Sequence, residues 1–236
     1  MPERLWYLKR CDLFRRLSDE DLRRLELRCR WRNFARGEPI YLPADQADGV
    51  LLLAEGRVRI GSYSDDGKQT ILAFIEPGEL FGELALVAPT SREEFAEAIG
   101  KSTVVLIPRD AFEELIEANA QVALGVTKLF GLRRQRIERR LKYLLFRSNR
   151  ERLVHLLLEL VEQYGQRTAA GVELAVKLSH QDLASIIGST RETVTVVLGE
   201  LQRDGLVTIG RQKVVLRDLG RLAAEINVAA PTVKGA

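Results

Sequence analysis

Short apolar segments separated by turn residues make up the first half of the chain. Residues 40–42, 49–53, 57–63, 69–75 and 102–107 are rich in aliphatic side chains and are candidate strands. Turns such as Arg36-Gly37-Glu38-Pro39 and Glu76-Pro77-Gly78-Glu79 lie between them, and glycine supplies the positive φ that tight turns need. Several short strands at close spacing predict an antiparallel sandwich or a small barrel.

Helical patterns flank these strands. Ser18 precedes three acidic residues and Leu22, as a helix N-cap does, and Pro108 begins a second short helix that ends near Asn119. From residue 120 to about residue 147 one side of the chain keeps a repeat of about 3.5 to 3.6 residues. The positions of this repeat are Val122, Val126, Leu129, Arg133, Ile137, Leu141 and Leu144. We predict one long helix whose stripe packs against a second copy of the chain or, alternatively, within its own domain.

A second, mainly helical domain follows. Ser148 or Asn149 can cap a helix with a leucine-rich face. Residues 206–209 and 213–216 flank Gly210 and predict a hairpin, and Asp218 can cap a last helix. We expect the tail from residue 228 to be disordered.

The centre of this domain has the spacing of a helix-turn-helix. Ser179 caps a helix that contains Ala184, Gly188 follows four residues later, and Val194 and Val197 lie in the next helix. Two helices that cross through a short turn need a small residue at the crossing, a glycine in the bend and apolar residues that hold the second helix. With the hairpin after it, the unit is a winged helix-turn-helix.

Length and composition agree with a two-domain globular chain. The 236 residues are 46% hydrophobic and 29% charged, and this length favours two domains over one. We divide the chain into residues 1–119, a long helix over 120–147, a helical domain over 148–227 and a tail over 228–236. No signal-peptide or membrane-spanning pattern is present in the sequence, which predicts a cytoplasmic protein with no membrane partner.

Charge becomes informative only through its distribution. The net charge is +3, which by itself does not indicate a nucleic-acid partner. Between Lys128 and Arg152, however, there are ten basic residues and two acidic ones. This run is either the solvated face of a helix or a field that attracts an anion, DNA or a small ligand.

Metal and catalytic chemistry are not indicated. The two cysteines, Cys11 and Cys29, have neither C-x-x-C spacing nor a nearby histidine, so we expect no zinc and no iron-sulfur cluster. We interpret both as packed small side chains, and a redox role is not decided by the sequence. No Ser-His-Asp set and no G-x-x-x-x-G-K loop occurs, so we do not predict an enzyme.

Two segments carry candidate binding chemistry. The helix that starts at Arg191 would place Arg191 and Glu192 at base edges in the major groove of DNA, with Thr195 and Val196 one turn further. Phosphate contacts would come from polar side chains around it: Ser179, His180, Gln181, Thr190, Thr193, Arg211 and Lys213. The glycine-rich, acidic segment 77–85 is either a ligand loop, with Glu83 accepting from hydroxyls, or an ordinary barrel turn.

The order of a β-barrel, a long basic helix and a winged helix-turn-helix resembles the Crp-Fnr superfamily of bacterial transcription regulators over nearly the whole chain. The most specific matches are residues 188–198, similar to the family's recognition helix, and residues 81–86, similar to its phosphate-binding cassette. The resemblance implies an α+β fold with an N-terminal antiparallel β-roll, a dimerisation helix and a winged helix-turn-helix. It also implies a homodimer that binds a twofold-symmetric operator in double-stranded DNA and acts on RNA polymerase.

The resemblance carries over only in part. The family's Arg, Glu, Arg recognition triad falls on Arg191, Glu192 and Val196. Valine cannot donate a hydrogen bond, so one guanine contact is lost or is replaced by contact with a thymine methyl group.

The implied effector site departs further from the family pattern. Its candidate residues are Gly82, Glu83, Leu84, Ala85, Arg92, Glu93, Ile137 and Glu138. Glu93 replaces a Ser or Thr that holds the cyclic phosphate in nucleotide-binding members, and a carboxylate repels a phosphate. No His or Cys lies between Trp31 and Arg109 to bind haem. We therefore expect a regulator without an effector or with another small anion; cyclic AMP activation, and a sensor acting through protein contacts, are the alternatives.

Overall fold

The computed structural model describes residues 2–64, 67, 69–87, 91–210 and 213–233. The chain forms two compact units, Met1–Gln135 and Arg136–Ala236. The border between them lies inside the long helix α4 (Ala120–Phe146), which we had treated as a separate segment. Each unit is described by itself.

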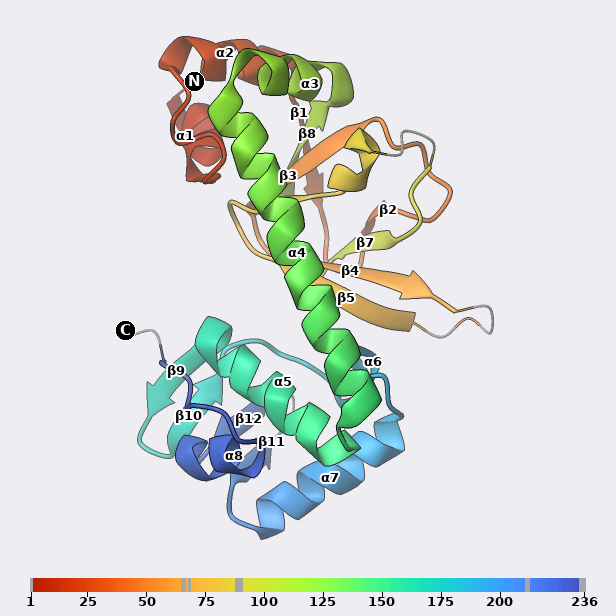
Figure 1. Cartoon of the computed structure of the whole chain (residues 1–236), viewed down its shortest axis with the longest axis vertical. Helices are drawn as coiled ribbons and strands as arrows, with labels where there is room; N and C mark the ends of the chain where they lie inside the picture. The colour runs from red at the N-terminus through yellow and green to blue at the C-terminus, as the bar shows by residue number, and fades with distance from the viewer. Residues whose placement is uncertain (1, 65–66, 68, 88–90, 211–212, 234–236) are drawn as a thin grey trace. The chain divides into compact units, whose positions relative to one another are not determined.

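Two antiparallel four-stranded sheets form the body of the first unit (Figure 1). One sheet has the order β1-β8-β3-β6 and the other β2-β7-β4-β5. The strands are β1 (Arg30–Phe34), β2 (Pro39–Tyr41), β3 (Gly49–Glu55), β4 (Val58–Tyr63), β5 (Gln69–Ile75), β6 (Leu80–Phe81), β7 (Phe95–Ala98) and β8 (Ser102–Pro108). The predicted antiparallel roll is therefore confirmed.

Both faces of strand β3 are covered by a hydrophobic core. Successive side chains of a strand point to opposite faces. Leu51 and Leu53 join the core between the two sheets, whereas Val50 and Leu52 join a second core under the helices. Both faces are therefore covered, and every residue of β3 except Glu55 is buried.

Helices build the second core of this unit. They are α1 (Pro2–Arg10), α2 (Asp19–Arg28), α3 (Arg109–Ala118) and the start of α4. Ser18 accepts from the Asp21 amide as the N-cap of α2, as predicted. Val122, Val126 and Leu129 of α4 pack on this core, so the first part of the predicted stripe is used within its own domain.

Four elements of the first unit, α1, β1, β6 and β7, were missing from our prediction, and so was the short 3₁₀ helix Glu83–Leu86. Strand β1 reads Arg-Trp-Arg-Asn-Phe and β7 reads Phe-Ala-Glu-Ala. Neither has a run of aliphatic residues. Each pairs with strands that do, β1 with β8 and β7 with β2 and β4, so tertiary pairing and not local pattern places them.

The second unit packs helices on a small sheet. Helix α5 (Asn149–Tyr164), capped by Ser148, packs against α6 (His180–Ile187), α7 (Arg191–Arg203) and α8 (Leu219–Glu225). The sheet has the order β11-β12-β10-β9. Its strands are β9 (Gly165–Thr168), β10 (Gly171–Leu174), β11 (Val207–Gly210) and β12 (Lys213–Leu216), of which the β9–β10 hairpin was not predicted.

The helix-turn-helix forms as its spacing predicts. Ala184 is fully buried, and Gly188 ends α6 with φ +65°, a conformation that glycine adopts without strain. Val194 and Val197 are buried on the inner side of α7. The turn between α6 and α7 is therefore set by the small residue, the glycine and the apolar face together, as predicted.

The remaining segments agree with simple capping and packing. Asp218 caps α8 as predicted. In the tail, residues 228–233 have neither helix nor strand, but Val233 is buried; residues 234–236 lie outside the described residues. No helix in the described part of the chain is long and apolar enough to cross a membrane.

Candidate nucleic-acid interface and ligand cassette

The start of α7 presents the predicted base-reading residues to solvent. Arg191, Glu192 and Thr195 are exposed, and Val196 is 59% exposed. The residues between and after them, Val194, Val197, Leu198 and Leu201, are buried. One face of α7 thus holds the helix in its domain, and the opposite face carries a cation, an anion, a hydroxyl and an apolar group.

A groove of about 540 Å³ lies beside this face. The start of α6, the start of α7 and the wing strands β11 and β12 form its walls; the lining residues are Leu178, Ser179, His180, Gln181, Arg191, Ile209, Gly210, Lys213 and Val214. Five of the sequence-predicted DNA contacts are therefore brought together in one concave surface. Arg211, another predicted contact, lies outside the described residues.

Several predicted phosphate ligands are already engaged inside the protein. Ser179 Oγ accepts from the Asp182 amide over 3.1 Å and the Asp182 carboxylate accepts from the Ser179 amide over 2.8 Å, which forms a capping box. Ser179 Oγ also donates to this carboxylate over 2.6 Å. Thr190 caps α7 by accepting from the Thr193 amide over 3.2 Å, and the two threonine hydroxyls lie 3.0 Å apart. These hydroxyls shape the helix starts, where backbone amides are available to an anion.

Lys213 also has an internal partner. Its ammonium group lies 2.6 Å from the Glu173 carboxylate of β10, and the two side chains are 52% and 30% exposed. A DNA phosphate at the wing would compete with Glu173 for the lysine. The β9–β10 hairpin, which was absent from our prediction, thus supplies a counter-charge to the wing.

A charge cluster anchors the far end of α7. The Arg150 guanidinium of α5 donates to Asp204 over 2.7 Å and to Glu225 over 3.0 Å, and it lies 3.5 Å from Glu200. Hydrogen bonds to Glu225 and Asp204 raise the pKa of Arg150 above its ordinary value. Asp204 is the C-cap of α7, so this cluster ties the end of the exposed helix to α5 and α8.

The cassette of the first unit is closed by its own side chains. Gly82 has φ +65°, and a Cβ there would lie 2.7 Å from the Arg92 guanidinium, so only glycine fits without displacement. The residues Glu83–Leu86 form a short 3₁₀ helix in which Glu83 is 5% exposed and Ala85 is buried, whereas Leu84 is exposed. Glu83 forms an ion pair with Arg133 of α4, which also donates to the Leu80 carbonyl over 2.5 Å.

Arg92 is buried and bound to the backbone. It is 6% exposed and donates to the carbonyls of Gly82 over 2.6 Å and Gly49 over 2.7 Å. The guanidinium carbon lies 4.7 Å from the centre of the Tyr41 ring, within the range of a cation–π contact. Arg92, which was predicted to bind phosphate, therefore links the cassette to β3 in this structure.

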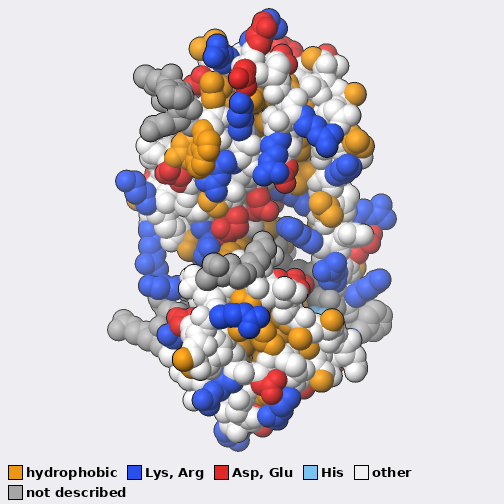
Figure 2. Space-filling view, turned by 90° about the vertical axis from the view of Figure 1, so that its left-hand side faces the viewer, with side chains coloured by type: hydrophobic (Ala, Val, Ile, Leu, Met, Phe, Trp, Pro, Cys, Tyr) orange, Lys and Arg blue, Asp and Glu red, His pale blue; other side chains and the backbone are white. Residues whose placement is uncertain are grey.

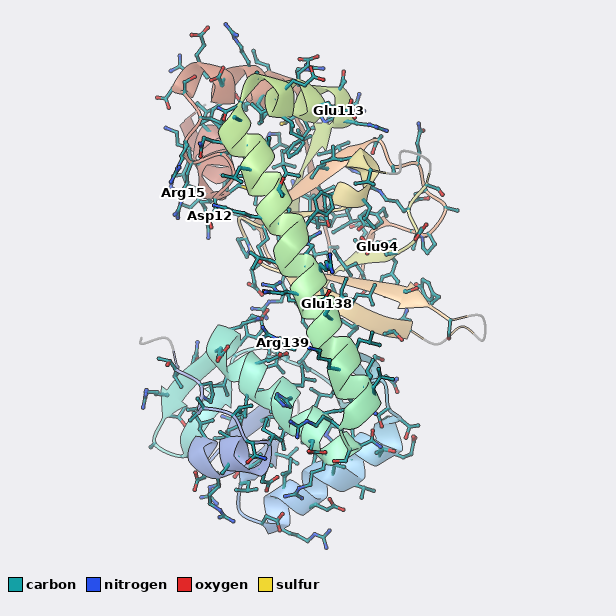
Figure 3. All side chains as sticks on the ribbon, in the orientation of Figure 1. Asp12, Arg15, Glu94, Glu113, Glu138 and Arg139 are labelled. Atoms are coloured by element: carbon teal, nitrogen blue, oxygen red, sulfur yellow. The ribbon has the colours of Figure 1, made fainter. Side chains whose placement is uncertain are left out.

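Glu94, which directly precedes β7 (Figure 3), joins this cluster. The Tyr41 hydroxyl donates to its carboxylate over 2.8 Å. Burial raises the pKa of Glu94, while the Tyr41 hydrogen bond and the Arg92 charge act in the opposite direction. Burial also raises the pKa of Tyr41. Arg133 is thus paired with Glu83, Arg92 is bound to backbone carbonyls and acts on Glu94 only through its charge, and Glu93 is exposed.

The later part of α4 carries exposed apolar side chains among its many basic ones. Ile137, Leu141 and Leu145 are 68%, 53% and 66% exposed. Glu138 follows Ile137 on the same helix (Figure 3). Both were predicted effector contacts, and both lie in the second compact unit; their contact with an effector stays a prediction.

In Figure 2 the Lys and Arg side chains, in blue, are spread among acidic and apolar ones on the face in view.

Sequence reasoning missed three members of the cassette cluster. Arg133 was assigned to the helix seam, and Tyr41 and Glu94 were assigned no role. Arg133 falls on the repeat of α4 among apolar residues, so its charge at that position was the available signal. Tyr41 and Glu94 come together only through the pairing of β2 with β7, which local patterns do not reveal.

Comparison with known proteins identifies a family for each of the two domains. Residues 31–119 match the family model of the cyclic nucleotide-binding domain, and residues 151–225 match that of the Crp-like helix-turn-helix domain. The chain is 30% identical to the global nitrogen regulator of Nostoc sp. over 185 residues, 78% of this chain and 83% of the relative. It is 26% identical to the CRP-like cAMP-activated global transcriptional regulator of Mycobacterium tuberculosis over 191 residues, 81% and 85% of the two chains.

A solved structure shares the fold. A CRP/FNR-family transcriptional regulator from Thermus thermophilus superposes with a TM-score of 0.69 at 31% identity, covering 84% of this chain and 98% of that one. These domains and relatives are transcription regulators and not enzymes. With the exposed face of α7 and the paired sheets in place, the chain belongs to the Crp-Fnr superfamily of transcription regulators.

Proposed function

We propose that this regulator is a homodimer that reads a twofold-symmetric DNA operator without a bound effector. One observation carries the effector independence. In the cassette, Arg133 is already paired with Glu83, and Arg92 is buried and bound to two backbone carbonyls. An incoming anion would have to break these contacts, whose burial makes them costly to lose.

Cyclic AMP fits this arrangement poorly. The cyclic phosphate of the nucleotide needs cationic or hydroxyl donors, but Glu93 stands where nucleotide-binding members have a hydroxyl, and Arg92 is 6% exposed. The mycobacterial relative is described as cAMP-activated, so activation by cyclic AMP is the second candidate. A small anion other than a nucleotide is a weaker alternative, because it would have to break the same contacts.

The dimer is proposed from the exposed part of α4. Ile137, Leu141 and Leu145 follow one another at intervals of four residues and are each more than half exposed. Large apolar groups at this spacing on a long helix favour pairing with another helix. A second copy of α4 would cover them and would give the two copies of α7 the twofold symmetry of an operator. Contact with RNA polymerase is part of the same proposal and rests on the family alone.

On DNA, the start of α7 would enter the major groove. Arg191 can donate to guanine O6 and N7, Glu192 can accept from a cytosine amino group, and Val196 suits a thymine methyl group. Lys213 and Gln181, on the walls of the groove, would contact phosphate and set the register. Two half-sites about one helical turn apart, about 34 Å, are expected.

Selection of random duplex DNA on the purified protein tests this proposal. The selection is made at about 0.1 M salt without any added ligand, because phosphate contacts weaken with salt. A twofold-symmetric sequence with half-sites about one turn apart is the expected result. Recovery of such a sequence only in the presence of cyclic AMP would establish the second candidate, and recovery of a single half-site would contradict the dimer.

A further inference from the structure

One side chain, Arg152 of α5, connects the end of α4 to the end of α6. Its guanidinium donates to the Leu144 carbonyl through Nη2 over 2.6 Å and to the Arg147 carbonyl through Nε over 3.0 Å. Nη1 lies 3.5 Å from the carbonyl of Ile187, the last residue of α6, at the outer limit of a hydrogen bond. The last turn of α4 therefore lies beside α5 and α6 (Figure 1).

The carbonyl groups at these helix ends need donors from elsewhere. The last four carbonyls of an α-helix have no partner within the helix, and a cation is favourable there because the helix dipole is negative at that end. The guanidinium offers its N–H donors in a fixed planar fork, whereas a lysine offers a compact charge on a flexible stem. Arg152 thus satisfies carbonyls of two helix ends and also fixes their direction relative to each other.

A second contact joins the end of α4 to the turn of the helix-turn-helix. Gly188 forms this turn with φ +65°. A Cβ built on Gly188 would lie 3.0 Å from Cδ2 of Leu144, so the leucine side chain lies against the turn. This apolar contact is independent of the hydrogen bonds of Arg152 and places the same two segments together.

The link between α4 and α5 is short and held on both sides. It consists of Arg147 and Ser148. Ser148 forms a capping box with Glu151, and Arg147 donates to the Glu151 carboxylate over 2.7 Å. Because the Arg147 carbonyl is also bound by Arg152, neither linking residue is free to act as a flexible hinge.

The direction of α4 matters for a dimer on DNA. The exposed residues Ile137, Leu141 and Leu145, which we assign to pairing of two copies, lie on α4 within the second compact unit. If α4 is fixed to the helix-turn-helix, the pairing of two α4 helices also fixes the distance between the two copies of α7. We propose, on the basis of the dimer and the DNA-reading function above, that Arg152 is a positioning residue that sets the spacing of the two half-sites.

This role would appear in the preferred spacing and not in the reading of each half-site. One added base pair moves a half-site by about 3.4 Å along the duplex and turns it by about 34°. A dimer with a rigid junction cannot follow this displacement, but a dimer with a loosened junction can follow it in part. Arg152 itself would contact no DNA.

The test uses the selected operator and versions of it with one or two base pairs inserted or deleted between the half-sites. Affinity is measured by fluorescence anisotropy at constant salt. For wild type we expect a loss of about tenfold or more for each change of one base pair, because base contacts of one half-site are lost. Arg152→Gln should bind the unaltered operator more weakly and lose less than about threefold on the same change.

Arg152→Lys separates the hydrogen-bonding fork from the charge. It keeps the cation at the helix ends but cannot hold the carbonyls in one plane, so its spacing preference should be broadened as in Arg152→Gln. A duplex with a single half-site should bind wild type and both variants equally, because α7 is unchanged. Substitutions that only destabilise the fold would instead lower the affinity for all duplexes by the same factor.

Arg150→Gln is the matched control. Arg150 lies two residues earlier on α5, but it binds Asp204 and Glu225 at the far end of α7. Its loss should lower the melting temperature of the second unit and leave the spacing preference as narrow as in wild type. Leu144→Ala, which removes the apolar contact with Gly188, should broaden the preference and serves in place of Arg152→Gln if that variant does not fold.

The outcomes separate this proposal from the one it rests on. A spacing preference in the Arg152 variants as narrow as in wild type, or one broadened equally in Arg150→Gln, overturns the role of Arg152 and leaves the DNA-reading function intact. Wild-type protein that binds only a single half-site, or no specific sequence, overturns the proposed function itself.

Discussion

The cassette of the first unit and the start of α7 in the second unit are both rich in charge, but they use it in opposite ways. In the cassette, Arg92 and Glu83 are almost fully buried, and each is bound to a partner from the same chain. At the start of α7, Arg191 and Glu192 are exposed, and the structure gives neither an ion pair among the described residues.

Under our proposal, this difference separates the part of the family's chemistry that the chain retains from the part that it has lost. Buried charges persist where they are paired and hydrogen-bonded, so the cassette residues have become part of the packing of the β-roll. Exposed charges on a rigid helix contribute little to stability and remain available to a partner. The variants below should therefore separate stability from DNA affinity.

The largest effect is expected from Arg92→Ala. The substitution leaves the carbonyls of Gly82 and Gly49 without their donor and opens a cavity beside Tyr41. We expect a loss of roughly 2 to 5 kcal/mol in the stability of the first unit, measured by urea denaturation. Operator affinity under folding conditions should change little; a variant as stable as wild type would show that Arg92 is not part of the packing.

Arg191→Ala should have the converse effect. Because Arg191 is exposed, the melting temperature should hardly change, but operator affinity should fall by roughly 1 to 3 kcal/mol for each half-site. Binding to operators substituted at one base pair shows whether the preference there is relaxed. An equal loss on all sequences would mean that Arg191 contacts phosphate instead of a base.

Val196→Arg sharpens the interpretation of the missing triad member. The side chain is 59% exposed on the reading face, so an arginine fits without repacking. We expect a gain of about 1 to 3 kcal/mol on operators with guanine at the facing position, measured by competition between two operators. Val196→Ala is the control and should weaken only operators with thymine there. An unchanged preference in both variants would remove Val196 from the interface.

Glu173→Gln tests the counter-charge of the wing. Without the carboxylate, Lys213 is free to contact phosphate, and one source of repulsion is lost. Because the pair is partly exposed, the gain in affinity should be below about 1 kcal/mol, about fivefold at most. The salt dependence of binding should become steeper. A loss of affinity would indicate that the pair is needed to hold the wing in place.

The smallest expected effect is on how the stability of the second unit depends on pH. His155 on α5 is buried, and burial together with the nearby Arg147 lowers its pKa below the ordinary 6.5. The unfolded chain then binds a proton more readily than the folded one, so stability is lost as pH falls through about 6.5 toward the folded value. The melting temperature should drop more steeply on acidification in wild type than in His155→Phe; parallel pH profiles would contradict it.

The sequence predicts the DNA-reading unit better than the cassette, for physical reasons. The turn depends on Ala184, Gly188 and Val194, which are close in sequence and are required by local backbone geometry and helix crossing. Arg92 instead reaches the Gly49 carbonyl of β3 and Glu83 pairs with Arg133 of α4, each more than 40 residues away in the sequence. Residue type indicates that such a charge needs a partner but does not indicate which one.

The strands show the same distinction between local sequence pattern and long-range pairing. Aliphatic runs predicted β3, β4, β5 and β8, because each of these strands buries apolar side chains. Strands β1, β7, β9 and β10 are short or polar and exist through their neighbours. Of the predicted stripe on α4, Val122, Val126 and Leu129 pack on the first unit itself, and Ile137 and Leu141 are exposed and remain for a second copy.

The most direct test of the account compares operator affinity with and without cyclic AMP, on the operator selected in the absence of ligand, at about 0.1 M salt. If the cassette charges are already satisfied within the protein, we expect equal operator affinity in both conditions. A ligand that binds the DNA-binding and non-binding states equally does not change their populations. An increase of about 100-fold or more on adding the nucleotide would contradict the account and would mean that the contacts of Arg92 and Glu83 open to admit a ligand.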